Sequence, residues 1–151
     1  MNAAGWNFAA YQAAAQEGEL AVPGAVLKYR LAGPASAREV VVFESGWSAS
    51  LAYGVWLEHA LIPQVRVLSY DRAGVGDSRC SAPVSTQAMT RQLLALLDGL
   101  GIQQPVIIAG HSYGGLIAAL QAAQAPECVK RFVQIAPTRE FDRPLVDRSL
   151  K

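Results

Sequence analysis

The chain has 151 residues, of which 52% are hydrophobic and 17% charged, and its formal net charge is +1. The length fits a single domain, and the composition predicts a well-filled hydrophobic core and excludes a disordered chain. Because the charges form no basic or acidic block, nothing in the sequence indicates nucleic acid or a membrane as a partner.

The amino-terminal part of the chain predicts a helix followed by a β-hairpin. Residues Trp6–Gln16 are rich in alanine, and they predict a short helix that ends near a C-terminal cap at Gly18. The segments Glu19–Val22 and Ala25–Leu31 flank the dipeptide Pro23-Gly24, which is typical of a hairpin turn.

Between residues 39 and 135, predicted strands and helices alternate along the chain. Asp71–Pro83 is expected to be a loop, and Ser85 is the expected N-cap of the helix that follows it. The alternation predicts an α/β fold, with a mostly parallel sheet and helices on both faces. The expected strands are Glu39–Phe43, Val65–Tyr70, Pro105–Ala109 and Val129–Ile135, and the expected helices are Leu51–Leu61, Ser85–Asp98 and Gly114–Ala125.

The segment around Ser112 carries the strongest functional signal. An apolar run leads into Gly110-His111-Ser112-Tyr113-Gly114, and an alanine-rich helical pattern follows. A Gly-x-Ser-x-Gly pattern between a strand and a helix is typical of a nucleophile elbow, a strained turn that lifts the serine hydroxyl clear of the sheet. The amino end of the following helix places N–H groups beside the position where an oxyanion would form.

Two further motifs follow the first two expected parallel strands. They are Phe43-Glu44-Ser45-Gly46-Trp47 and the segment from Asp71 to Ser78. Because the carboxyl ends of parallel strands meet at one edge of a sheet, we expect both motifs to converge with Ser112.

The glycines after Asp71 do not form a dinucleotide fingerprint. Arg79 stands where the third glycine would be, and no helix is expected to begin at this loop. We expect Asp71 to hydrogen-bond backbone groups in a turn, with Gly74 and Gly76 allowing left-handed conformations.

In their order and spacing, the three motifs resemble the α/β-hydrolase superfamily, specifically its cofactor-free serine hydrolases of the esterase and C–C hydrolase type. The resemblance implies that Ser112 is the nucleophile, that Gly110 and Gly114 are the elbow glycines, and that the backbone N–H groups of Trp47 and Tyr113 form the oxyanion hole. It also implies a small-molecule ester or acyl substrate, an acyl-serine intermediate and no cofactor.

This chain departs from the superfamily at the oxyanion turn, where many members have His-Gly and this chain has Ser45-Gly46. Because the donor is a main-chain N–H group, we expect it to persist. The side chain of Trp47 either lines the acyl pocket or simply covers the edge of the sheet.

The usual catalytic base is missing from its expected place. The superfamily order is serine, acid, histidine, whereas both histidines of this chain, His59 and His111, precede Ser112. We expect His59 to face solvent and the side chain of His111 to point away from the nucleophile. Glu140 and Asp142 are either displaced triad acids or solvated loop charges. The histidines and cysteines are too widely spaced to indicate a metal site.

The resemblance extends over residues 19–138. We therefore expect a helical extension at 1–18, a partial hydrolase core at 19–138 that is truncated after the strand following the nucleophile helix, and a tail at 139–151. Three interpretations remain open: the amino-terminal portion of a serine hydrolase, one part of a split hydrolase, or an inactive descendant that serves as a binding or assembly module. The strand Val129–Ile135 would become an apolar sheet edge, which predicts a homo-oligomer or a complementing chain.

The amino terminus, the apolar runs and the cysteines bear on the cellular compartment of the protein. The first basic residue is Lys28, so the amino terminus lacks the basic region of a secretory signal, and no apolar run approaches the ~20 residues of a membrane span. Two cysteines, Cys80 and Cys128, predict free thiols in a reducing compartment rather than a disulfide framework. We therefore expect a cytoplasmic protein.

Overall fold

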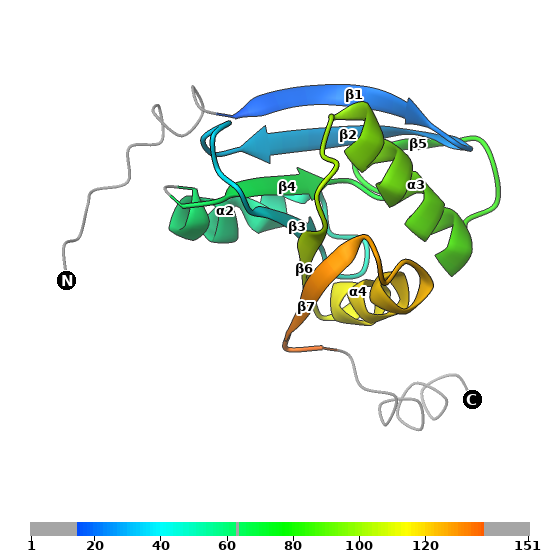
Figure 1. Cartoon of the computed structure of the whole chain (residues 1–151). Coiled ribbons are helices and arrows are strands. Elements are labelled where there is room, and N and C mark those ends of the chain that lie inside the picture. Colours follow the sequence, from blue (N-terminus) through cyan, green and yellow to red (C-terminus); the bar gives the residue numbers. More distant parts are fainter. Residues whose placement is uncertain (1–14, 63, 138–151) are drawn as a thin grey trace.

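The computed structural model describes residues 15–62 and 64–137, which form one mixed sheet with its covering helices (Figure 1). The strands are β1 (Gln16–Val22), β2 (Ala25–Ala32), β3 (Val40–Glu44), β4 (Arg66–Tyr70), β5 (Arg79–Cys80), β6 (Val106–His111) and β7 (Val129–Ile135). The helices are the 3-10 helix η1 (Leu51–Gly54), α2 (Val55–Leu61), α3 (Thr86–Gly99) and α4 (Tyr113–Gln124). None of the helices in this described part is long and apolar enough to cross a membrane.

The sheet has the strand order β1-β2-β4-β3-β6-β7, and β5 pairs with β2. Strands β4, β3, β6 and β7 pair in parallel, whereas β1, β2 and β5 join the sheet through antiparallel pairs. Each connection between the parallel strands contains a helix, because the chain has to return to the opposite end of the sheet. This confirms the predicted α/β class and places the carboxyl ends of β4, β3 and β6 side by side.

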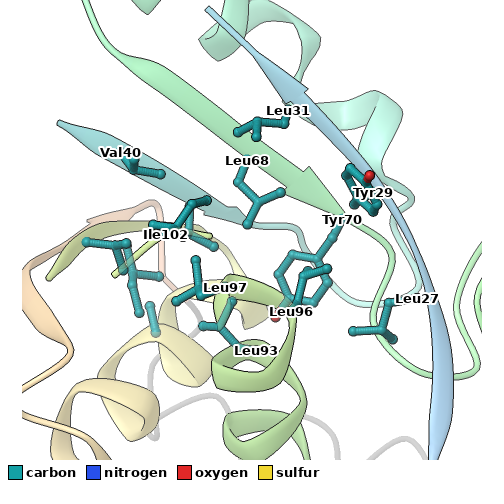
Figure 2. Packing of buried hydrophobic residues seen from close by; sticks show 14 of the residues in the cluster. Leu27, Tyr29, Leu31, Val40, Leu68, Tyr70, Leu93, Leu96, Leu97 and Ile102 are labelled. Atoms are coloured by element: carbon teal, nitrogen blue, oxygen red, sulfur yellow. The ribbon is translucent and has the colours of Figure 1, made fainter. Parts of the chain in front are cut away.

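Helices cover both faces of the sheet, as the alternation of side chains along its strands requires. Val40 and Val42 belong to the large cluster under α3, whereas Val41 belongs to a second cluster under α2. Burying an aliphatic side chain of this size stabilises the fold by about 1.5–3 kcal/mol. Figure 2 shows the large cluster, whose labelled members are Leu27, Tyr29, Leu31, Val40, Leu68, Tyr70, Leu93, Leu96, Leu97 and Ile102.

Two local predictions are confirmed by backbone geometry. β1 and β2 form an antiparallel hairpin around Pro23-Gly24, and Gly24 adopts a φ of +75°. Ser85 caps α3, and its Oγ accepts a hydrogen bond from the N–H of Ala88 at 3.1 Å. Both features lie where turn and capping chemistry predicts them.

Two other predictions are wrong. Gly18 is not a helix cap, because it lies inside β1; a Cβ atom there would lie 2.7 Å from the hydroxyl of Tyr29 on the neighbouring strand. The expected helix before it falls mostly on residues 1–14, outside the described part. Within the expected Asp71–Pro83 loop, Arg79 and Cys80 form β5, which pairs with Val26 and Ala25 of β2.

β7 forms one edge of the sheet within the described residues, where it pairs with β6 (Figure 1). Its Phe132 and Val133 side chains are each 47% exposed. Successive residues of a strand point to opposite faces, so both faces of β7 are open. The edge strand is therefore open, but it is apolar only in part, because it also carries the exposed Lys130, Arg131 and Gln134.

Candidate active site

A sharp backbone turn at Ser112 joins β6 to α4. Ser112 has a φ of 53° and a ψ of −121°, a left-handed conformation that costs a non-glycine residue about 1–3 kcal/mol. The residue precedes the first turn of α4, where Gly115 donates its N–H to the Ser112 carbonyl oxygen at 2.9 Å. The expected strand, strained serine turn and helix are all present.

The two glycines that flank Ser112 are required by close backbone packing. A Cβ atom on Gly110 would lie 2.3 Å from the carbonyl oxygen of Gly114. A Cβ atom on Gly114 would lie 2.1 Å from the carbonyl oxygen of Glu44 and 2.4 Å from that of Ser45. Real Cβ atoms do not approach backbone this closely, so the elbow is built on two positions that admit only glycine.

The turn after β3 lies directly against the elbow. A Cβ atom at Gly46 would lie 3.7 Å both from the Cβ of Ser112 and from Nδ1 of His111. The Trp47 and Tyr113 rings meet edge to face, with their centres 4.9 Å apart. Trp47 is nevertheless 73% exposed, so its side chain flanks the elbow at the surface. The predicted convergence of the two motifs is confirmed.

A buried polar cluster that the sequence analysis missed lies under this turn. Arg72 pairs with Glu44 at 3.2 Å and donates to the carbonyl oxygens of Ser45 and Gly46, each at 2.7 Å. Glu44 also accepts hydrogen bonds from the Tyr70 hydroxyl and from Nε2 of Gln121. Burial, followed by the charge of Glu44, raises the pKa of Tyr70 well above its usual value, so the phenol stays protonated and donates.

One sequence signal points to this cluster. Glu44 ends an otherwise apolar strand and is fully buried, and a buried carboxylate needs a cation and hydrogen-bond donors. Arg72 is that cation, and it lies 28 residues away in the loop just after the neighbouring strand β4. The pairing therefore depends on the sheet order rather than on local sequence.

The loop after β4 is a structural support, as expected. The two carboxylate oxygens of Asp71 accept hydrogen bonds from the N–H groups of Leu51 and Asp77, at 2.6 and 2.9 Å. Gly76 has a φ of +55°, and a Cβ atom there would lie 2.2 Å from the Asp71 carboxylate. Asp71 thus ties the loop to the segment that follows the β3 turn.

The other candidate residues lie in different places. His111 is half-buried on the elbow, and His59 is half-buried on α2, so the expectation that His59 faces solvent is wrong. Glu140 and Asp142 lie outside the described residues. Within residues 15–62 and 64–137, no three histidine, cysteine, aspartate or glutamate side chains are grouped to hold a metal ion. Cys80 and Cys128 are both free thiols.

The chain is similar to known hydrolases over most of its length. Residues 39–149 match the family described as alpha/beta hydrolase fold. The chain is 35% identical to the mouse sn-1-specific diacylglycerol lipase ABHD11 over 111 residues, which are 72% of this chain and 36% of that protein. It is 36% identical to Lipase LipV of Mycobacterium tuberculosis over 102 residues, or 64% of this chain and 38% of that protein.

A solved structure gives the same result for the fold. The carboxylesterase CesB from Bacillus subtilis superposes with a TM-score of 0.77 and 24% identity, over 84% of this chain and 45% of its own. This chain therefore spans less than half the length of these relatives, as expected for a truncated hydrolase core. The family match begins at Glu39, just before β3, and extends across both the β3 turn and the elbow. The chain belongs to the α/β-hydrolase-fold family.

Proposed function

We propose that this chain carries the nucleophile and the oxyanion hole of a serine hydrolase that cleaves ester or similar acyl bonds. The observation that carries the proposal is the strained backbone of Ser112, held between two obligatory glycines and packed against the β3 turn. A serine without a catalytic role gains nothing from a left-handed backbone conformation that lowers the stability of the fold. The names of the relatives, which include lipases and a carboxylesterase, support an ester as the substrate class.

The chemistry proceeds through a covalent intermediate. Oγ of Ser112 attacks the carbonyl carbon of the substrate while a general base takes the hydroxyl proton. The N–H groups of Trp47 and Tyr113 stabilise the resulting oxyanion. The carbon–oxygen bond to the alcohol then breaks, and the alcohol leaves with the proton. Water attacks the acyl-serine in the second step and restores the hydroxyl.

The general base is the part of this mechanism that the described residues do not supply. Both histidines precede Ser112 in the sequence, whereas in this fold the histidine follows the serine. The relatives are more than twice as long as the segment that this chain matches. We propose that the acid and the histidine come from the remaining part of the fold, in the same polypeptide or in a second chain.

Labelling with a fluorophosphonate probe tests the proposal, because the probe reacts only with an activated serine. We expect Ser112 to be labelled when the remaining part of the fold, which supplies the base, is present in the same polypeptide or as a second chain, and Ser112→Ala to remain unlabelled in the same preparation. Ser81→Ala is the matched control, since Ser81 is an exposed serine of the loop before α3. If the folded wild type is not labelled with the remaining part of the fold present, or if Ser112→Ala is labelled equally, the proposal fails. The chain would then be better described as a binding or assembly module.

A further inference from the structure

We propose that Arg72 is a positioning residue that orients the N–H group of Trp47 for the oxyanion hole. The role of that N–H group in the oxyanion hole rests on the proposed function. The contacts by which Arg72 orients the peptide do not depend on it. Arg72 contacts the two peptide units that lead into Trp47, and it does so from a buried position 4% exposed. No part of the reaction requires Arg72 to touch the substrate.

The direction of the Trp47 N–H group depends on the peptide bond between Gly46 and Trp47. Nη2 of Arg72 donates to the Gly46 carbonyl oxygen at 2.7 Å. The described part of the chain has no cis peptide bonds, and in a trans peptide the C=O and the following N–H point in opposite directions. Fixing the Gly46 oxygen toward Arg72 therefore turns the Trp47 N–H away from Arg72.

The Trp47 N–H group is unpaired within the described part of the chain and lies in a turn beside the nucleophile. No hydrogen-bond acceptor is found for it among the described residues. The turn that carries it lies beside Ser112, and Ser48, the next residue, has a left-handed φ of 52°. A strained turn that leaves an N–H group unpaired beside a nucleophile is suited to bind a developing negative charge.

Arg72 is itself held in place by several contacts. Its Nη1 reaches Oε2 of Glu44 at 3.2 Å, and Glu44 is held in turn by Tyr70 and by Gln121, the latter at 2.7 Å. The guanidinium carbon also lies 5.8 Å from the centre of the Tyr113 ring. One fixed cation therefore contacts the Tyr113 ring and the Gly46 carbonyl oxygen of the peptide unit that carries the Trp47 N–H group.

The planar fork of arginine is essential to this arrangement. Two of its nitrogens bind two successive carbonyl oxygens while one of them also faces the carboxylate. A lysine retains the charge for Glu44 but has a single nitrogen and cannot hold the same geometry. Arg72→Lys is therefore the informative variant. Arg79→Lys is its matched control, because Arg79 forms an exposed ion pair with Glu19 at 2.7 Å.

The test is the order of the Trp47 amide, measured by ¹⁵N relaxation on the whole chain. In the wild type we expect an order parameter of about 0.85, as in rigid backbone, and in Arg72→Lys a value under about 0.6. Arg79→Lys should leave it unchanged. A mobile Trp47 amide in the wild type overturns the proposal without any variant. If Arg72→Lys does not fold, Glu44→Gln, which removes the charge that holds Arg72, should lower the same order parameter.

The kinetics of fluorophosphonate labelling give a second measurement, which distinguishes a role of Arg72 in positioning the Trp47 N–H group from a role in binding the probe. If the wild type is labelled by a fluorophosphonate, Arg72→Lys should lower the maximal labelling rate about 10²-fold and leave the half-saturating probe concentration unchanged. An unchanged rate in a variant with a disordered Trp47 amide would contradict the role in the oxyanion hole. If the wild type is not labelled even with the remaining part of the fold present, the proposed function fails, and the amide measurement still decides whether Arg72 orients the peptide.

Discussion

The amino end of α4 packs so closely on the end of β3 that a Cβ atom at Gly114 would lie 2.1 Å from the carbonyl oxygen of Glu44. This contact joins the helix after Ser112 to the strand that leads into the Ser45-Gly46-Trp47 turn. The elbow and the proposed oxyanion turn are therefore one rigid unit rather than two loops that happen to be neighbours. The buried pair of Glu44 and Arg72 lies beneath the same junction.

We expect Gly114→Ala to lower the free energy of unfolding by about 3 kcal/mol, because overpacking against backbone cannot be relieved by a side-chain rotation. Gly101→Ala is the control, since Gly101 has a φ of +70° but nothing within 4 Å of its added Cβ. It should cost about 1 kcal/mol through backbone strain alone. Urea unfolding of the two variants measures both values, and equal losses would contradict the packing argument.

The sequence allowed the elements that carry the site to be predicted, because each has a local cause. The β-branched run of β3, the proline-glycine turn after β1 and the Ser85 cap of α3 all depend on residues close in sequence. The turn at Ser112 was predictable for the same reason, because its two glycines lie within two residues of the serine. Only the topology of alternating strands and helices was then needed to bring Ser112 and Gly46 together.

The features that were missed depend on pairing between distant residues. β5 has two residues and exists only because Arg79 and Cys80 meet the start of β2. Gly18 has the sequence context of a helix cap, but in the structure its lack of a side chain leaves room for the Tyr29 side chain on the neighbouring strand. The cation that neutralises Glu44 lies in the loop after another strand, so no local pattern identifies Arg72 as its partner.

A second buried carboxylate, Glu58 on α2, should make stability depend on pH. Glu58 is fully buried, its Oε2 lies 3.4 Å from Nε of Arg30, and its Oε1 accepts a hydrogen bond from Ser69. Burial raises the pKa of Glu58 from 4.5 to about 7, although the Ser69 hydrogen bond acts in the opposite direction. The folded protein therefore holds a proton on Glu58 at pH values where the unfolded chain has released it.

The sign of the effect follows from this raised pKa. The stability contributed by the protonated carboxyl is complete below about pH 4.5 and is lost as the pH rises through about 7. We expect Glu58→Gln, which keeps a neutral side chain of the same shape, to gain roughly 1–3 kcal/mol relative to the wild type between pH 5 and pH 8. Denaturant unfolding at several pH values measures this difference. Glu39→Gln, at an exposed carboxylate, is the control, and a difference at Glu58 that stays constant with pH would refute the prediction.

The exposed edge strand β7 predicts self-association, and we expect the partner to be a second copy of this chain. Phe132 and Val133 are each 47% exposed on opposite faces of this edge, beside the exposed Lys130 and Arg131, and unpaired strand edges recruit further strands. Sedimentation velocity should show a dimer or larger assembly whose population rises with concentration. Val133→Lys should shift the population to monomer, because a lysine on an edge strand opposes strand pairing. Val84→Lys is the matched control, since Val84 is a 43% exposed valine in the loop before α3.

Two outcomes would refute the prediction. One is a wild type that stays monomeric at all concentrations. The other is dissociation of the assembly by both lysine variants alike, because exposed apolar area in general would then explain the association.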